Sequence, residues 1–457
     1  MTSTSKSRRG FLRTGAQAGM LGAMSSLGLL TAAPAKAAVS DYKALVCLYL
    51  FGGNDGNNMI VPLDPTHYSA YTQIRGGAGL ALSTSSNTLL PQRTATLQAV
   101  SNPVSQPFAF HSSMPEIDAL FGQGNVAAVL NMGSLRQPLS KTQYNAGTGI
   151  PPQLFSHPDQ TLQNQSGSAN ASGTGWGGRL VDLLGTGGHL DAVSLGSGGL
   201  FVEGATVHGN QLPSDGNLDL AGMSFWPQNE ADVRRNALRQ ILGSNHPNVL
   251  AGTADKALLN GMDLVTDLAA ANASAALATV FPGGNLATQF KTVAHLIRQR
   301  ATQGPGRQVY FVSMGGFDTH GGQSWTQQDL LRDVSLAMAA FQAALVEIGQ
   351  ANSVTTFTMS DFGRTLMPNS SGTDHAWGNH HLVMGAAVKG GVYGRFPDFV
   401  LGGADDATGR GAWIPQFSNQ QFGATLGRWF GADNTMLDAA FKNELSQFGM
   451  SDLGFMG

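Results

Sequence analysis

Cysteine is nearly absent from this 457-residue chain, which contains only Cys47. A single cysteine excludes an intrachain disulfide, so packing and hydrogen bonding must hold the fold together. Cys47 stands inside the apolar run 44–51, and this setting predicts a buried core residue.

Charge is also scarce. Charged residues make up 12% of the chain and the formal net charge is −3, whereas the usual charged share is about 25%. An acidic chain without a run of basic residues is not expected to bind nucleic acid. Against this background, clustered acids and histidines carry more information about function.

Long hydrophobic runs are missing beyond the start of the chain. After residue 37 no segment offers about eighteen consecutive apolar residues, the length that a membrane-spanning helix needs. We therefore expect a mature protein that does not span a membrane.

The first 37 residues have the order of a twin-arginine signal peptide. Residues 7–12 read Ser-Arg-Arg-Gly-Phe-Leu, a Gly/Ala/Leu stretch follows, and Ala35-Lys36-Ala37 suits a peptidase that prefers small residues. Cleavage after Ala37 would remove five basic residues and no acidic one, which takes the net charge from −3 to −8. The pattern predicts the twin-arginine translocase as a partner during export, and the periplasm or the cell exterior as the destination.

Residues 38–457 are expected to form one α/β domain. Apolar, β-rich runs alternate with stretches of helical period, which favours a doubly wound, mostly parallel sheet flanked by helices. The expected strands cover 45–51, 126–130, 309–314, 354–359 and 382–388, and the expected helices cover 255–270, 289–300, 329–348, 420–430 and 436–448. Residues 74–110 and 184–227 are rich in Gly, Ser, Asn and Thr, and we expect them to be loop-rich insertions.

Three of the expected strands run into an acid: Asp55, Asp318 and Asp361. The carboxyl ends of parallel strands meet at one edge of a sheet, where open α/β sheets bind ligands. Together with His320, these acids offer the oxygen and imidazole ligands that suit Zn²⁺ or Mn²⁺. The competing interpretation is that Asp and Gly after a strand simply make turns.

The densest group of candidate ligands is residues 372–381, Gly-Thr-Asp-His-Ala-Trp-Gly-Asn-His-His. His375 is the preferred additional metal ligand, because it follows a loop from which its side chain can reach the same edge. His380 and His381 could orient ligands, contact a substrate or begin a helix. For His381 a structural role is favoured.

Ser156 and Arg364 are candidates for the chemistry itself. Ser156 precedes a histidine near an expected helix start, where a serine could attack phosphorus or sulfur. An ordinary helix cap is the competing interpretation of Ser156. Arg364 follows Asp361 by three residues and is expected to clamp an anion at the same edge.

Together these segments resemble the domain-of-unknown-function 1501 (DUF1501) family of exported bacterial proteins, within the alkaline phosphatase and sulfatase-like superfamily. The resemblance covers nearly the whole chain and implies an alkaline-phosphatase-like α/β fold. It rests on the twin-arginine start and on segments 52–58, 154–160, 173–179, 315–323, 359–365 and 373–379.

The resemblance also implies a metal centre. Asp318, His320 and His375 look like one metal site of the superfamily. Asp55 and Asp361 look like part of the other. The implied cofactor is one or two divalent ions, with Zn²⁺ first and Mn²⁺, Mg²⁺ or Ca²⁺ as alternatives.

Phe362 departs from the superfamily pattern, in which a histidine directly follows the later aspartate. The departure leaves both a one-metal centre and a weakened two-metal centre open. The implied activity, with Ser156 as nucleophile, is hydrolysis of phosphate or sulfate esters of small molecules or polymers. The alternative is a non-catalytic exported binding or assembly protein that keeps the fold and a structural metal.

Overall fold

The computed structural model describes residues 39–170, 172–218, 227–244, 248–273 and 276–457. The expected signal peptide lies outside these ranges. Contacts divide the chain into residues 1–37 and a compact unit of residues 38–457, and only the second unit is described below. Within the described ranges, no helix has both the length and the apolar character that crossing a membrane requires.

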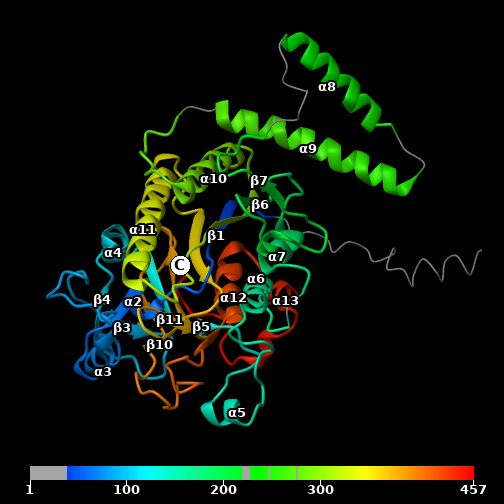
Figure 1. Ribbon diagram of the computed structural model, residues 1–457. Coiled ribbons are helices and arrows are strands. Elements are labelled where there is room, and N and C mark those ends of the chain that lie inside the picture. The colour runs from blue at the N-terminus through cyan, green and yellow to red at the C-terminus, as the bar shows by residue number, and fades with distance from the viewer. Residues whose placement is uncertain (1–38, 171, 219–226, 245–247, 274–275) are drawn as a thin grey trace, which may run out of the picture. The chain divides into compact units, whose positions relative to one another are not determined.

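A twelve-stranded sheet runs through the described part of this unit (Figure 1). Its strand order is β2-β4-β3-β13-β5-β12-β9-β1-β8-β6-β7, and β14 pairs with β5. The strands are β1 (Tyr42–Leu50), β2 (Ile60–Pro62), β3 (Arg93–Gln98), β4 (Ser105–Phe110), β5 (Val126–Gly133), β6 (Ala192–Leu195), β7 (Asn210–Leu212), β8 (Gly306–Met314), β9 (Val354–Ser360), β12 (Asn379–Met384), β13 (Gly391–Tyr393) and β14 (Phe417–Ser418). A separate two-stranded sheet pairs β10 (Arg364–Pro368) with β11 (Thr373–His375).

Helices cover both faces of the large sheet. One group contains α4, α10 and α11, and the other contains α6, α7, α12 and α13 (Figure 1). The helices are α2 (Gly56–Met59), α3 (Pro65–Arg75), α4 (Pro115–Gly122), α5 (Lys141–Asn145), α6 (His157–Ser166), α7 (Trp176–Leu184), α8 (Gln228–Leu242), α9 (Val249–Ala273), α10 (Asn285–Ala301), α11 (Gln323–Glu347), α12 (Asn419–Phe430) and α13 (Asn434–Ala440). This arrangement confirms the predicted doubly wound, mostly parallel fold class.

Strand β1 is central to the parallel part of the sheet. It pairs in parallel with β8 on one side and with β9 on the other, and Leu50 stands opposite both Met314 and Ser360. The three strands therefore end at the same level. As a result, the loops that carry the three predicted acids leave the sheet side by side.

Burial along β1 explains why its sequence is continuously apolar. Ala44, Val46 and Leu48 belong to a core that also contains Phe290 of α10 and Phe341 of α11. Successive side chains of a strand face opposite sides, so their neighbours pack under the second helical layer. Cys47 is one of these neighbours; it is fully buried, as predicted, and burial raises the pKa of its thiol.

Several segments differ from the sequence-based expectation. The expected insertion 184–227 contains β6 and β7, which belong to the main sheet. The expected helix 436–448 ends early, because Lys442 and Asn443 adopt left-handed φ angles of 56° and 60° that a helix cannot continue through. Residues 93–110 are not an excursion outside the core. They form β3 and β4, and β3 joins the main sheet through its parallel pairing with β13.

Histidines 380 and 381 lie in strand β12, and neither begins a helix. The Asn131 N–H donates to Nδ1 of His380 at 3.0 Å, so His380 is held as a neutral ring with its proton on Nε2. Burial lowers the pKa of His380 to about 4. Burial, together with the neighbouring His380, lowers the pKa of His381 to about 3.

These depressed pKa values predict acid sensitivity of the fold. The ordinary histidine pKa is about 6.5, so the unfolded chain binds protons before the folded chain does. The contribution to stability is complete above pH 6.5 and is lost as the pH falls toward 4. Replacing His381 by Leu should therefore reduce the slope of unfolding free energy against pH between 6 and 4 by about 1.4 kcal/mol per pH unit.

Denaturant unfolding at a series of pH values measures this slope. The control is His208→Leu, because the His208 side chain is 82% exposed and a change there should leave the slope as it is. An unchanged slope in the His381 variant would contradict the assignment of acid sensitivity to this strand.

Candidate metal centre

The candidate site lies where β1, β8 and β9 end together. Gly52 follows β1 with a φ of 115°, and a Cβ atom there would lie 2.3 Å from the Asp318 nitrogen. Only glycine permits this backbone conformation at this separation. The absence of a side chain at position 52 thus lets the loop after β8 approach the loop after β1.

Three side chains converge at this edge. His157, Asp318 and His375 each offer one ligand atom, and these atoms all lie within 4.8 Å of one another. His157 Nε2 lies 3.5 Å from Oδ2 of Asp318, and His375 Nε2 lies 3.3 Å from Oδ1 of Asp318. We call this group the histidine–aspartate cluster.

His320 lies against the outer side of the cluster. Its Nε2 is 3.0 Å from Oδ1 of Asp318 and 2.9 Å from Nε2 of His375. Its Nδ1 is 3.3 Å from Oδ1 of Asp374, which also binds Arg410. The structure therefore brings together Asp318, His320 and His375, the three residues predicted for the first metal site.

Hydrogen bonds fix the two cluster imidazoles in the orientation that a metal needs. The Phe155 carbonyl can only accept, so Nδ1 of His375, at 2.8 Å, carries the proton and leaves Nε2 with a lone pair. Nδ1 of His157 lies 2.6 Å from Oδ2 of Asp361, which likewise directs Nε2 toward Asp318. Ligand histidines of metal sites are commonly held by such a carbonyl or carboxylate.

Backbone strain accompanies this arrangement. Phe155 has a φ of 69°, a left-handed conformation that costs a bulky residue on the order of 1 kcal/mol or more. The strained peptide turns the Phe155 carbonyl to His375, while two residues later His157 enters the cluster from the first turn of α6. Strain of this kind is concentrated at functional sites.

Electrostatics keep the cluster ready to bind a cation. Burial alone would raise the pKa of Asp318, but the Arg364 guanidinium and three imidazoles lower it below its ordinary value. Burial, with the nearby His157 and Arg364, lowers the pKa of His375. An ionised carboxylate beside a neutral imidazole is the protonation state that metal binding requires.

The donor set fits a zinc ion. Tetrahedral zinc with bonds of about 2.0–2.1 Å separates its ligand atoms by about 3.4 Å. Oδ2 of Asp318 lies 3.5 Å from Nε2 of His157, and Oδ1 lies 3.3 Å from Nε2 of His375 and 3.0 Å from Nε2 of His320. All three ligand atoms of the cluster lie within 4.8 Å of one another, so small shifts of the side chains would complete a zinc site. The Asp318 side chain is 46% exposed, so an ion there would stay accessible from solvent.

Asp361 touches the cluster only through His157. Its Oδ2 accepts a hydrogen bond from the Gly52 N–H at 3.0 Å and a second one from Nδ1 of His157. Its Oδ1 is buried and has no hydrogen-bond partner among the described residues. This placement makes Asp361 a residue that orients a ligand, and its direct coordination of a metal stays a prediction.

Asp55 is not part of the cluster. Its carboxylate forms a fully buried ion pair with Arg75, in which Nη1 lies 2.6 Å from Oδ2 and Nη2 lies 3.1 Å from Oδ1. The side chain of Gln323 donates to Oδ2, and the Asn57 N–H donates to Oδ1 at 3.1 Å. With both oxygens engaged, the arrangement does not favour the predicted role of Asp55 as a metal ligand.

Phe362 packs against both histidines of the cluster. Its ring centre lies 4.7 Å from that of His157 and 4.6 Å from that of His375. It is 2% exposed. An apolar ring therefore packs against the cluster, and together with the ion pair of Asp55 it favours one metal over two.

The two predicted catalytic residues meet the cluster differently: Arg364 contacts Asp318, and Ser156 directly precedes His157 in the chain. Arg364 is fully buried and its Nη2 donates to Oδ1 of Asp318 at 2.9 Å, while Nε and Nη1 find no partner among the described residues. Ser156 stands between Phe155 and His157 at the N-cap position of α6. Its side chain makes no capping hydrogen bond to the backbone, and its hydroxyl donates to the Asp159 carboxylate.

Sequence reasoning missed two important residues. His157 was noted only as the neighbour of a candidate nucleophile, although an imidazole at a helix start beside the proposed serine is itself a ligand signal. No sequence pattern marks Arg75 as a partner of Asp55, because Arg75 lies in helix α3 and contacts Asp55 only in the folded chain.

Residues 42–448 match the family described as "Protein of unknown function (DUF1501)". The chain belongs to the DUF1501 family. The predicted resemblance is thereby confirmed for the family, whose description assigns no activity. No curated protein sequence matches this DUF1501 chain.

Solved structures with some likeness to this DUF1501 chain include hydrolases and a synthase. The PsFucS1 sulfatase from Pseudoalteromonas sp. is 11% identical, with a TM-score of 0.30 over 77% of this chain and 64% of the sulfatase. The lipoteichoic acid synthase LtaP from Listeria monocytogenes is 7% identical, with a TM-score of 0.30 over 83% of this chain and 76% of the synthase. The TAB5 alkaline phosphatase is 7% identical, with a TM-score of 0.27 over 78% of this chain and 95% of the phosphatase.

The cluster predicts which substitutions abolish zinc binding by this DUF1501 protein. Asp318→Ala and His375→Ala should each lower the zinc content of protein purified without chelator to near zero, because each removes a donor. Asp361→Asn should weaken binding by about 10- to 100-fold, since it disturbs the orientation of His157 without removing a residue of the cluster. Metal analysis by mass spectrometry, followed by competition titration, measures both effects.

His208→Ala is the matched control, because it removes an exposed histidine far from these contacts. Equal zinc content in the wild-type protein and in both alanine variants of the cluster would contradict the assignment.

Proposed function

We propose that the protein is a metal-dependent hydrolase of phosphate or sulfate esters. The observation that carries this proposal is the convergence of His157, Asp318 and His375 at an accessible edge beside the buried Arg364. Three protein ligands would leave a coordination position for a substrate oxygen, as catalytic zinc sites do. The family resemblance of the sequence supports the same reaction class.

Arg364 gives the site its preference for an anionic ester. Burial lowers the pKa of its guanidinium, while Asp318 opposes this effect. A guanidinium held in a region of low dielectric attracts a phosphate or sulfate group more strongly than one in water. When bound, a divalent ion would supply Lewis-acid chemistry at an ester oxygen.

Ser156 is the proposed nucleophile. Its oxygen would form a bond to phosphorus or sulfur, its proton would pass to the Asp159 carboxylate, and the bond to the alcohol oxygen would break. Asp159 would return that proton to the departing alcohol. Water would then hydrolyse the seryl ester, release phosphate or sulfate and restore Ser156. The N-terminal end of the ten-residue helix α6 favours the negative charge on the transferred group.

A non-catalytic binding protein is the second candidate. Ser156 stands at the N-cap position of α6, a position that also suits a purely structural serine. The Phe362 ring stands beside both cluster histidines, where the superfamily pattern would supply a further histidine. Both observations favour a protein that binds a metal ion but does not hydrolyse a substrate.

Replacing Ser156 by Ala separates the two functions. We expect the rate of hydrolysis of 4-nitrophenyl phosphate or sulfate to fall by at least about a thousandfold, because the nucleophile is lost. Zinc content should stay as in the wild-type protein, because Ser156 donates to Asp159 and not to the cluster. A chelator should abolish wild-type turnover and added zinc should restore it.

Ser140→Ala is the control, since Ser140 also stands at an N-cap position but belongs to the exposed capping box of α5. A zinc-loaded wild-type protein that hydrolyses neither class of ester would overturn the hydrolase proposal and favour the binding protein.

We also propose that the chain is exported through the twin-arginine route to the periplasm or the cell exterior. The support is the Arg8-Arg9 pair ahead of Phe11 and the small-residue segment that ends at Ala37. Changing both Arg8 and Arg9 to Lys should retain the protein in the cytoplasmic fraction, because the translocase recognises the pair. Arg13→Lys is the control and should be exported normally; export of the double variant would contradict the proposal.

A further inference from the structure

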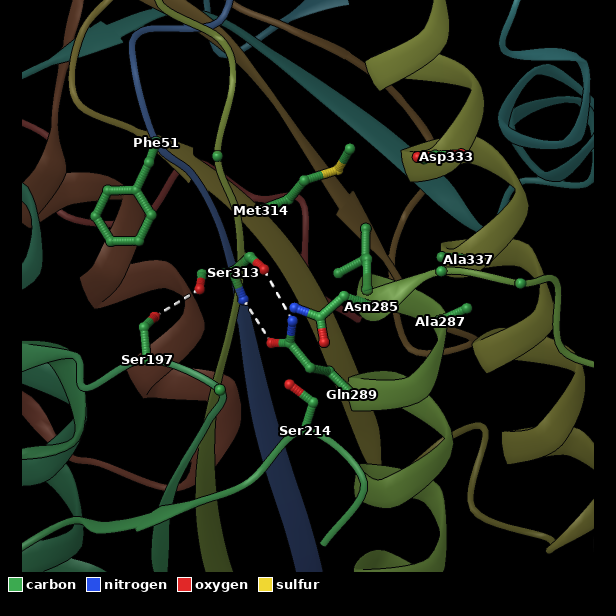
Figure 2. Close-up of a pocket in the computed structure, with 15 residues that line it drawn as sticks. Phe51, Ser197, Ser214, Asn285, Ala287, Gln289, Ser313, Met314, Asp333 and Ala337 are labelled. Atoms are coloured by element: carbon green, nitrogen blue, oxygen red, sulfur yellow. Dashed lines mark hydrogen bonds between the residues drawn. The ribbon is translucent and has the colours of Figure 1, made fainter.

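A cavity of about 580 Å³ opens beyond the carboxyl ends of β1, β6 and β8 (Figure 2). Its walls come from the ends of β1, β6 and β8, from the first turn of α10 and from the middle of α11. The volume lies within the range of small-molecule pockets. Nothing in the proposed reaction has so far used this space.

The topology places the cavity where open α/β sheets bind ligands. The chain that leaves β8 passes through α11 to β9, beyond β1, whereas the chain that leaves β6 passes to β7 on the opposite side. Neighbouring parallel strands whose connections diverge in this way leave a crevice at their carboxyl ends. The cavity is lined by Gly196 and Ser197 after β6 and by Ser313 and Met314 of β8.

Gln289 keeps this crevice open. Beyond Ser194, strand β6 no longer pairs with β8, and the Gln289 side chain takes its place. It accepts the Ser313 N–H at 2.9 Å and donates to the Ser313 carbonyl at 3.0 Å (Figure 2). Gln289 thus supplies the hydrogen bonds of the Ser313 backbone on the side where β6 no longer pairs with β8. The Ser313 hydroxyl lines the cavity wall, 2.7 Å from the hydroxyl of Ser197.

The lining mixes polar and apolar groups and is nearly uncharged. It contains the hydroxyls of Ser197, Ser214 and Ser313, and it is bounded by the ring of Phe51. Asp333 is the one charged residue among those that line the cavity. An anion would meet this carboxylate, and a cation would meet the N-terminal end of α10, so neither sign of charge is favoured.

From this lining we infer that the cavity binds an uncharged, hydroxyl-rich ligand, such as a sugar ring or a related polyol. Serine hydroxyls both donate and accept, as the hydroxyls of such a ligand do, and an aromatic ring offers an apolar face. The further inference that this ligand is the alcohol half of the ester rests on the function proposed above.

Two short links join the cavity to the cluster. Phe51 lines the cavity, and the N–H of the next residue, Gly52, donates to Asp361, which orients His157. Gly315 also lines the cavity, and the same loop continues to Asp318. A substrate whose anionic group meets Arg364 can therefore place its neutral part in the adjoining cavity.

Binding of neutral probes tests this inference without turnover. Saturation-transfer NMR would be recorded with glucose, galactose and glycerol, on full-length protein both stripped of metal and loaded with zinc. We expect a sugar to bind in both states, because no ligand of the cluster lines the cavity. Ser214→Trp, which fills the cavity from a loop, should weaken binding at least tenfold, and Ser313→Ala should weaken it about threefold without changing the fold.

Ser85→Trp is the matched control in an exposed loop and should bind as the wild-type protein does. The inference is overturned if none of the probes binds in either metal state, or if the Ser214 variant binds as tightly as the control. Failure of the hydrolase would look different, since sugar binding would persist in a protein that cleaves no ester.

Discussion

Strands β1, β8 and β9 end at the same level of the sheet, and the rest of the site depends on this constraint. Because Leu50 stands opposite both Met314 and Ser360, the loops after β1, β8 and β9 start at one height. A slip of one residue in either pairing would turn every side chain of the slipped strand to the opposite face. The continuous burial of β1 between two helical layers makes such a slip very costly.

Once these loops lie side by side, charge determines what each acid does. Asp55 faces the fully buried Arg75, and removing one partner of such a pair costs about 3–5 kcal/mol. Asp361 is directed to a backbone N–H and an imidazole, and Asp318 alone remains half exposed. Three acids that look equivalent in the sequence thus become a structural anchor, an orienting group and an accessible candidate ligand.

The sequence predicted the architecture well and the roles of the residues less completely. Alternation of apolar strands and helices is a local signal, and it correctly predicted the sheet and the edge at which the acids gather. The approach of His157 to Asp318 and of Arg75 to Asp55 depends on tertiary contacts between distant segments, which periodicity does not encode. The sequence did not predict the early end of α13. Lys442 and Asn443 adopt left-handed φ angles there, and no glycine marks the position in the sequence.

The ligands of the cluster come from three separate parts of the chain: the first turn of α6, the loop after β8 and strand β11. A bound ion would therefore act as a cross-link among segments that are otherwise joined by long stretches of polypeptide. Since the unfolded chain cannot present these groups together, each tenfold rise in free ion above the dissociation constant would add about 1.4 kcal/mol to the stability of the folded state. The resistance of this protein to heat and proteolysis would then depend on how much metal its surroundings supply.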